Sequence, residues 1–147
     1  MFRIFSSGFA EGAAIPRLHT CDGADLSPSL EWGEPPSATR SFGLLMEDPD
    51  APHGNWTHWI LWDIPSGTRT LPQGTTRIGT PGINDFGKSG YGGPCPPPGK
   101  PHRYYFRLFA LSVDRLALTA TSRRAEFEKA IAGKVLAEAA CIGKFSR

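Results

Sequence analysis

The chain has 147 residues and a formal net charge of +2, with 16 Lys and Arg against 14 Asp and Glu. This length suits one domain, residues 1–147, with its own core, and a charged content of only 20% argues against a disordered chain. The 17 glycines and 14 prolines leave little room for helix and predict a mainly β fold.

The distribution of charges, apolar residues and cysteines bears on the binding partners and the location of the protein. The last 50 residues hold ten basic residues against four acidic ones, but the two kinds are interspersed, so we expect no nucleic-acid partner. No run approaches the roughly 18 apolar residues of a transmembrane segment, and the first twenty residues lack the apolar stretch of a secretion signal. Cys21, Cys95 and Cys141 are widely spaced, which predicts reduced thiols and a cytoplasmic location.

Three strands are predicted from composition, in chain order. Residues 41–46 form a short apolar run that indicates a buried strand, and the prolines of residues 48–52 end it. Residues 56–65 are dense in aromatic and β-branched side chains and give the strongest strand prediction. Residues 103–111 partly alternate between polar and apolar, as expected for a strand with one buried face.

The remaining segments are loops, one helix and one ambiguous stretch. Residues 28–37 and most of residues 65–102 are rich in turn-forming residues. Ser122 is a candidate N-cap for a helix that Gly133 could end, because the residues between them are mostly good helix formers. Residues 135–145 fit either more helix or a strand.

Two motif matches point away from the chemistry they usually signal. Residues 82–89 fit the phosphate-binding GxxxxGK[ST] pattern, but the glycines and prolines that follow cannot begin the helix this motif needs. The proline-rich stretch 94–101 fits the pattern of a polyproline ligand, but we favour a rigid wall that fixes the groups next to it.

Trp59 and Trp62 are expected to lie in the core rather than to stack on a ligand. Asp48–Pro49 and Ala51–Pro52 are candidates for a cis peptide bond.

Polar residues at the ends of the predicted strands are the main candidates for a functional site. Asp48 and Asp50 follow the first predicted strand, His58 lies in the second, and His102 with Tyr104 opens the third. Side chains at strand ends of a β fold can meet at one cleft. Carboxylates, imidazoles and a phenol could serve as an acid–base set, a metal site or an anion site, and the spacing does not choose among these.

Four sequence blocks carry a resemblance to a known family. They are IPRLHTCDGADLSPSLEW (15–32), DPDAP (48–52), WTHW (56–59) and GYGGPCPPPGKPHRYYF (90–106). In this order they resemble the phosphatidylethanolamine-binding protein family, which includes the Raf kinase inhibitor proteins of animals and the flowering-time regulators of plants. The chain is most similar to the short bacterial and archaeal branch, without the C-terminal helix that animal members place beside the pocket.

The resemblance implies a fold and an assembly. It predicts a β-sandwich of two antiparallel sheets, one or two short helices near the C-terminus, and one small anion-binding pocket near a sheet edge. It also favours a strand over residues 135–145 and assembly as a homodimer.

The resemblance further implies a set of ligand-binding residues: Asp48, Asp50, Pro52, His58, Gly93, Cys95, Pro96, His102 and Tyr104. No catalytic residue, metal or cofactor belongs to this set. The backbone amides of Gly93 and Cys95 are expected to face the pocket, where a phosphate, acetate or phosphorylated head group binds. Because a carboxylate repels an anion, Asp48 is expected to be protonated or to face the amine of a head group.

Three functional hypotheses follow. The first is a non-enzymatic module that binds a small anion and modulates a kinase or protease partner. The second is a phosphoester hydrolase with Asp48, His58 and His102 as acid–base groups. The third is direct inhibition of a protease through an exposed loop. We favour binding over hydrolysis because neither Cys95 nor Ser89 has an evident group in sequence to activate it as a nucleophile.

Overall fold

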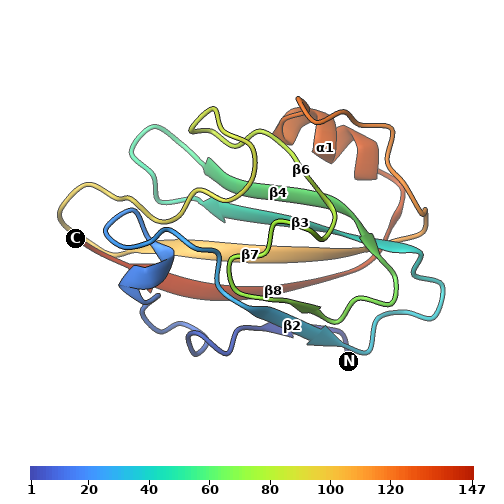
Figure 1. Ribbon diagram of the computed structural model, residues 1–147, viewed down its shortest axis with the longest axis horizontal. Coiled ribbons are helices and arrows are strands. Elements are labelled where there is room, and N and C mark those ends of the chain that lie inside the picture. Colours follow the sequence, from blue (N-terminus) through green and yellow to red (C-terminus); the bar gives the residue numbers. More distant parts are fainter.

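The computed structural model describes residues 1–147 as two antiparallel sheets packed face to face (Figure 1). The five-stranded sheet runs in the order β6 (Thr80–Pro81), β4 (Trp56–Pro65), β3 (Ser41–Asp48), β7 (His102–Leu111) and β8 (Val135–Phe145). The three-stranded sheet runs in the order β1 (Arg3–Phe5), β2 (Leu30–Gly33) and β5 (Thr70–Leu71). The predicted mainly β sandwich of two antiparallel sheets is therefore confirmed.

The long strands agree with the sequence and the short ones do not. The three predicted strands are β3, β4 and β7, and β8 shows that residues 135–145 form a strand. By contrast β2 lies inside residues 28–37, so the prediction of a loop there is wrong. Strands of two to four residues such as β1, β2 and β5 are too short to show a periodic pattern, and pairing with neighbours is what makes them strands.

One α-helix lies near the C-terminus, as predicted, but its cap differs. The helix α1 spans Arg124–Ile131 and its N-cap is Arg123, whose backbone N–H donates to Glu126 Oε1 at 3.0 Å. Ser122 is not the cap, because its hydroxyl oxygen accepts the backbone N–H of Thr119 at 3.0 Å. A single 3-10 turn, η1 (Arg17–His19), lies between β1 and β2 along the chain.

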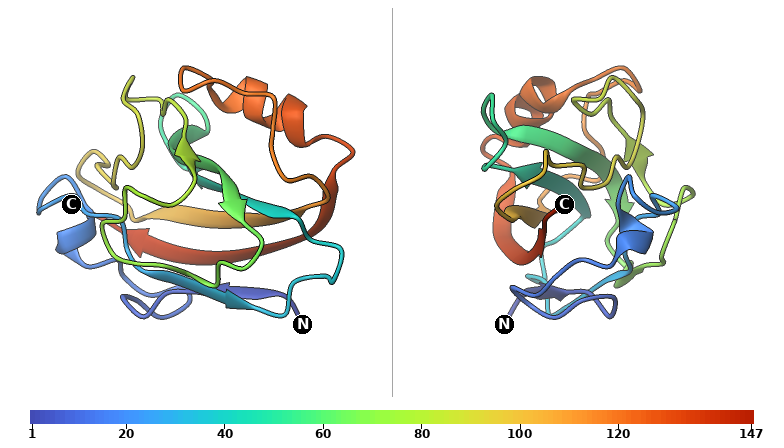
Figure 2. Two further views of the ribbon diagram at one scale, coloured as in Figure 1. Left: turned by 45° about the vertical axis from the view of Figure 1, so that its right-hand side comes forward. Right: turned by 90° about the vertical axis from the view of Figure 1, so that its left-hand side faces the viewer.

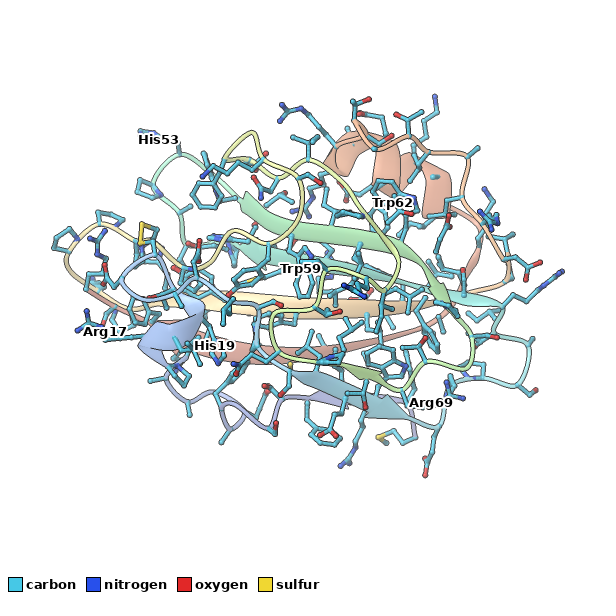
Figure 3. The ribbon with its side chains drawn as sticks, viewed as in Figure 1. Arg17, His19, His53, Trp59, Trp62 and Arg69 are labelled. Carbon is cyan, nitrogen blue, oxygen red and sulfur yellow. A yellow bond between two sulfur atoms is a disulfide. The ribbon has the colours of Figure 1, made fainter.

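The hydrophobic core has two parts, one on each face of the five-stranded sheet. Eighteen buried residues, including Trp32, Phe42 and Trp59, fill the space between the sheets. Eight more, including Trp62 and Phe127, pack between the outer face and α1, which lies at the edge of the molecule seen in Figure 2. This explains why all eight residues of β3 are buried. Trp59 and Trp62 are core residues, as predicted (Figure 3).

The cysteine prediction is wrong. Cys21 and Cys95, 74 residues apart, form a disulfide, and only Cys141 is a free, buried thiol. The two partners lie in different loops, so only the folding of the chain brings their Cα atoms to 5.4 Å. This pairing also removes the argument from reduced cysteines for a cytoplasmic location.

The structure also bears on the 82–89 segment, on the proline peptide bonds and on the length of the helices. Residues 82–89 form a loop closed by an Ile83–Ser89 bridge, and the next element along the chain is β7, so the prediction of a loop that does not lead into a helix is confirmed. All peptide bonds are trans, including Asp48–Pro49 and Ala51–Pro52. None of the helices is long and apolar enough to cross a membrane.

Candidate functional site

A cavity of about 170 Å³ opens at one end of the five-stranded sheet. β3 ends there at Asp48, while β4 and β7 begin there, because each of them is antiparallel to β3. The proline-rich loop after Gly93 forms another wall. The lining residues are Asp48, Ala51, Pro52, His53, Trp56, His58, Phe86, Cys95, Pro96, Pro97, His102 and Tyr104. Polar residues at the three strand ends therefore meet at one cleft.

Asp48 and His102 form a buried pair on the cavity wall. The ring Nδ1 of His102 lies 2.7 Å from Asp48 Oδ2, and the two side chains are only 11% and 4% exposed. The other oxygen, Asp48 Oδ1, accepts the backbone N–H of Asp50 at 2.8 Å. Because Nδ1 is bound to the carboxylate, Nε2 is the nitrogen of His102 left for a ligand. The carboxylate has a charge partner in the protein, an arrangement that the sequence did not suggest.

His58 occupies the cavity as a neutral ring. Its Nδ1–H donates to the Gly92 carbonyl at 2.6 Å, and the Gly92 N–H donates to the His58 carbonyl at 2.9 Å. Burial lowers the pKa of His58 below its ordinary value. The edges of the rings of Phe86 and Tyr104 pack against it, with centroids 5.3 and 5.2 Å away. Burial therefore disfavours the charged form of the His58 ring in this cavity.

Two buried polar groups on the cavity have no partner in the protein. They are the phenol oxygen of Tyr104 and the indole Nε1 of Trp56. Burial raises the pKa of Tyr104, so its hydroxyl keeps its proton and can donate. A buried donor left unpaired costs about 1–3 kcal/mol, and an acceptor atom of a ligand would recover that cost. Trp56 is not among the ligand-binding residues that the family resemblance implies, and its signal in the sequence was its place at the start of a strand, two residues before His58.

Two of the predicted ligand residues do not line the cavity. Asp50 forms a paired contact with the Arg103 guanidinium at 2.8 and 2.9 Å, which lowers the pKa of that carboxyl to about 2. The Gly93 N–H donates to Asp25 Oδ1 at 2.9 Å and is not available to a ligand. A side chain at Gly93 would collide with the His19 carbonyl, so this position requires glycine. Asp50 and Gly93 thus hold the segments around the cavity in place through contacts within the protein.

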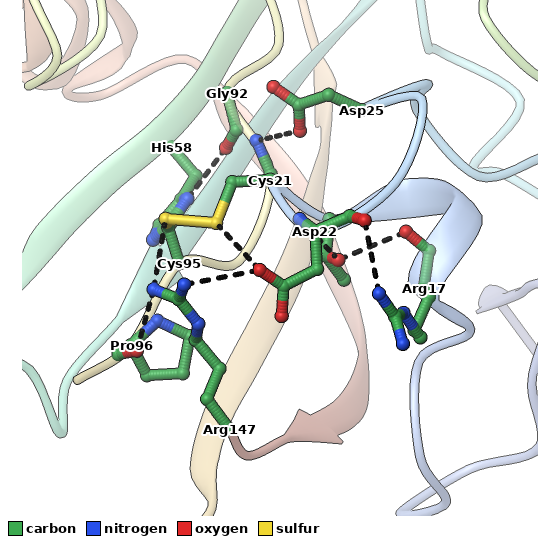
Figure 4. Close-up of a disulfide and its surroundings, with 11 residues drawn as sticks. Arg17, Cys21, Asp22, Asp25, His58, Gly92, Cys95, Pro96 and Arg147 are labelled. Carbon is green, nitrogen blue, oxygen red and sulfur yellow. Dashed lines mark hydrogen bonds and ion pairs between the residues drawn. A yellow bond between two sulfur atoms is a disulfide. The ribbon is translucent and has the colours of Figure 1, made fainter. Parts of the chain in front are cut away.

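Cys95 lines the cavity as half of a disulfide rather than as a thiol (Figure 4). Together with Pro96 and Pro97 it forms the wall contributed by the proline-rich loop. In this state the sulfur has no electron pair with thiolate character, so Cys95 is no nucleophile. Asp48, His58 and His102 are also not arranged as a group that could hold a metal ion.

A larger hollow does not compete with this site. It measures about 480 Å³, lies between β1 and β8, and is lined mostly by phenylalanine and alanine side chains. Its two charged lining residues, Arg3 and Glu11, are exposed at its rim. Convergent, buried polar groups distinguish a ligand site from a surface depression, and only the smaller cavity gathers several of them.

Comparison with known proteins agrees with the fold. Residues 5–146 match the family model described as phosphatidylethanolamine-binding protein. A UPF0098 protein of Aquifex aeolicus is 47% identical over 153 residues, which cover 100% of this chain and 90% of that protein. A UPF0098 protein of Methanothermobacter thermautotrophicus is 40% identical over 145 residues, 95% of each chain.

Two solved structures are similar over almost their whole length. One is a phosphatidylethanolamine-binding protein homologue from Chlamydia trachomatis, with a TM-score of 0.94 and 32% identity over 99% of this chain and 97% of that one. The other is Escherichia coli YbcL, described as a member of the mammalian phosphatidylethanolamine-binding protein family, with a TM-score of 0.94 and 32% identity over 99% and 98%. The chain therefore belongs to the phosphatidylethanolamine-binding protein family.

Proposed function

We propose that the cavity binds a small oxyanion, such as free phosphate or the phosphoryl group of a lipid head group, without turning it over. The observation that carries this proposal is the pair of unpartnered buried groups, Tyr104 Oη and Trp56 Nε1, on one small cavity. Both can donate a hydrogen bond and neither has an acceptor in the protein. An oxyanion supplies several acceptor oxygens at once.

The contacts that Asp48 makes within the protein support an anion as the ligand. Asp48 would repel an anion if its charge stood alone, but the His102 ring lies 2.7 Å from it. The two oxygens of the Asp48 carboxylate are engaged by His102 Nδ1 and by the Asp50 backbone N–H, and the same His102 ring leaves Nε2 for the ligand. An amine in a head group is then not needed to explain why an aspartate lines an anion cavity.

The state of the nearby nucleophile candidates supports binding rather than catalysis. Cys95 is in a disulfide, and Ser89 lines a different hollow beside Trp59. The one feature that favours hydrolysis is the Asp48–His102 pair, because a carboxylate that orients an imidazole is the arrangement of a general base. Such a base would need a water molecule as nucleophile. Release of phosphate from phosphoesters, lost in His102→Asn, would establish this second function.

Titration with phosphate and with phosphoethanolamine, followed by the NMR signals of the protein, tests binding. Saturable shifts are expected in the rings of His58, His102 and Trp56, and Trp56→Phe and Tyr104→Phe should each weaken binding about tenfold, the loss of one hydrogen bond to a charged group. Tyr105→Phe is the matched control, because Tyr105 does not line the cavity and its hydroxyl lies against Arg103. Absence of saturable shifts at millimolar ligand contradicts the proposal.

Several finer roles stay predictions. Modulation of a kinase or a protease by the loaded protein, direct protease inhibition through an exposed loop, assembly as a homodimer and a cytoplasmic location belong to this group. A stoichiometric inhibition assay with and without phosphate distinguishes a ligand-dependent modulator from a direct inhibitor. Sedimentation of the purified protein decides the oligomeric state.

A further inference from the structure

The segment 95–101, which carries part of the cavity wall, has few attachments to the rest of the protein. Its hydrogen bonds to other segments all involve Arg147, whose guanidinium donates to the Pro96 carbonyl at 3.4 Å and whose carbonyl accepts the Gly99 N–H at 3.3 Å. The remaining link is the disulfide from Cys95 to Cys21. The residues just before it are held firmly, since Gly92 is bound to His58 and Gly93 to Asp25.

The segment is also built to move as one stiff piece. Pro96, Pro97 and Pro98 are consecutive and fix their own backbone φ angles. Gly99 follows them with φ +139°, in a region that glycine adopts at no cost. A break at the disulfide would therefore leave this rigid proline stretch, with three lining residues of the cavity, attached to the rest of the protein only by its hydrogen bonds to Arg147.

The two sulfur atoms have different electrostatic surroundings (Figure 4). The guanidinium of Arg147 lies 3.7 Å from Cys95 Sγ, and the carboxylate of Asp22 lies 4.0 Å from Cys21 Sγ. The same guanidinium pairs with that carboxylate at 3.2 Å, so one ion pair lies along the disulfide with its cation on the Cys95 side. A nearby cation stabilises a thiolate and an anion destabilises it, so Cys95 is the better leaving group in thiol exchange. Cys21 and Cys95 are both exposed, so a thiol in solution can reach them.

We propose that the Cys21–Cys95 disulfide is a thiol-exchange site whose reduction by a dithiol detaches the 95–101 wall from the cavity. A thiolate of the dithiol attacks Cys21 Sγ, forming a new S–S bond there, and the Cys21–Cys95 bond breaks with its electron pair going to Cys95 beside Arg147. The second thiol of the dithiol then attacks the mixed disulfide and releases Cys21. The dithiol is oxidised to a disulfide, and its two protons end on Cys21 and Cys95.

The consequence for the ligand rests on the proposed function. Oxidised protein presents a fixed wall, while reduced protein must order residues 95–101 each time an anion binds. Ordering several side chains and a loop on binding lowers affinity, and we expect a loss of about tenfold for phosphate on reduction. The ligand affinity of this protein would then report the thiol state of its surroundings.

The direction of attack is tested with glutathione as a monothiol probe. After a short incubation, free thiols are blocked with N-ethylmaleimide at low pH and the peptides are mapped. Glutathione is expected on Cys21 and the maleimide on Cys95, and Arg147→Gln should slow the exchange about tenfold because the leaving thiolate loses its cation. Arg17→Gln is the matched control, since Arg17 contacts the Asp22 carbonyl but no sulfur. Glutathione on Cys95, or no exchange, overturns the proposal.

The effect on the wall is tested by comparing oxidised protein, reduced protein and the Cys21→Ser/Cys95→Ser variant. Amide exchange of Cys95, Gly99 and Lys100 should become faster on reduction, and the double variant should match the reduced protein. Phosphate affinity should fall with it. If oxidised protein does not bind phosphate, the proposed function fails, and the amide exchange still decides whether the wall is released. If both redox states bind phosphate equally and exchange equally, this proposal fails and the binding function stands.

Discussion

The ring of His102 lies with its Nδ1 2.7 Å from Asp48 Oδ2, so the last residue of β3 is tied to the first residue of β7. The neighbouring Asp50 uses its carboxylate differently, since it faces Arg103 outside the cavity. Two aspartates two residues apart therefore have separate roles. Asp48 orients a ligand-facing imidazole, while Asp50 holds the loop after β3 against β7.

Because Asp48 and Asp50 have separate roles, replacing each aspartate by asparagine should affect phosphate binding differently. Asp48→Asn should weaken phosphate binding about tenfold at pH 7, because His102 loses the carboxylate that holds its ring with Nε2 toward the ligand. Asp50→Asn should leave phosphate affinity unchanged, since Asp50 does not line the cavity. Isothermal titration calorimetry measures both. An Asp48→Asn protein that binds phosphate as well as or better than the natural one would show that the carboxylate is protonated or merely repels the ligand.

The buried neutral ring of His58 predicts a pH dependence of stability. The pKa of His58 is lower in the folded protein than in the unfolded chain, where it is about 6.5. Above pH 6.5 the ring is neutral in both states and its contribution is fully present. As pH falls, the unfolded chain binds a proton that the folded protein does not, so the free energy of unfolding decreases until the folded pKa is passed.

Two histidine-to-asparagine variants separate the contribution of His58 to the pH dependence of stability from that of another histidine. His58→Asn can keep the donor to the Gly92 carbonyl without titrating, so its loss of stability between pH 6.5 and 5 should be smaller than that of the natural protein. His53→Asn changes an exposed histidine of the same cavity rim and should leave the slope unchanged. Urea unfolding at a series of pH values measures the slopes. Equal slopes for the natural protein and His58→Asn would contradict the assignment.

The unpartnered hydroxyl of Tyr104 predicts that ligand binding is obtained at the expense of stability. Tyr104→Phe removes a buried donor that has no acceptor, so the ligand-free protein should become more stable by about 1 kcal/mol while its phosphate affinity falls. Thermal unfolding without phosphate measures the gain. A decrease in the free energy of unfolding would show that the hydroxyl is already satisfied in the ligand-free protein.

The disulfide predicts a large effect of reductant on stability. It joins residues 74 positions apart, and a crosslink of that span stabilises a protein by about 2–4 kcal/mol, mainly by restricting the unfolded chain. Urea unfolding with and without a dithiol measures this difference. The Cys21→Ser/Cys95→Ser variant should have the stability of the reduced protein and should not respond to reductant. An unchanged midpoint on reduction would mean that the crosslink contributes nothing.

The sequence by itself determined the long elements of this protein. Residues 41–48 and 56–65 carry enough apolar, aromatic and β-branched side chains to specify strands before any partner is known. The polar residues at their ends, Asp48 and His58, indicated where a cleft should lie. These features depend on neighbours in sequence, and local patterns report them directly.

Only the tertiary structure decided which groups meet. The Asp48–His102 pair spans 54 residues, the Asp25–Gly93 hydrogen bond 68 and the disulfide 74, and no local pattern encodes such pairings. The same holds for β2, whose four residues become a strand by pairing with β1 and β5. A side chain's partner is set by the packing of the two sheets and their loops. For this reason the sequence indicated most of the cavity's residues, and the fold assigned their hydrogen bonds and charges.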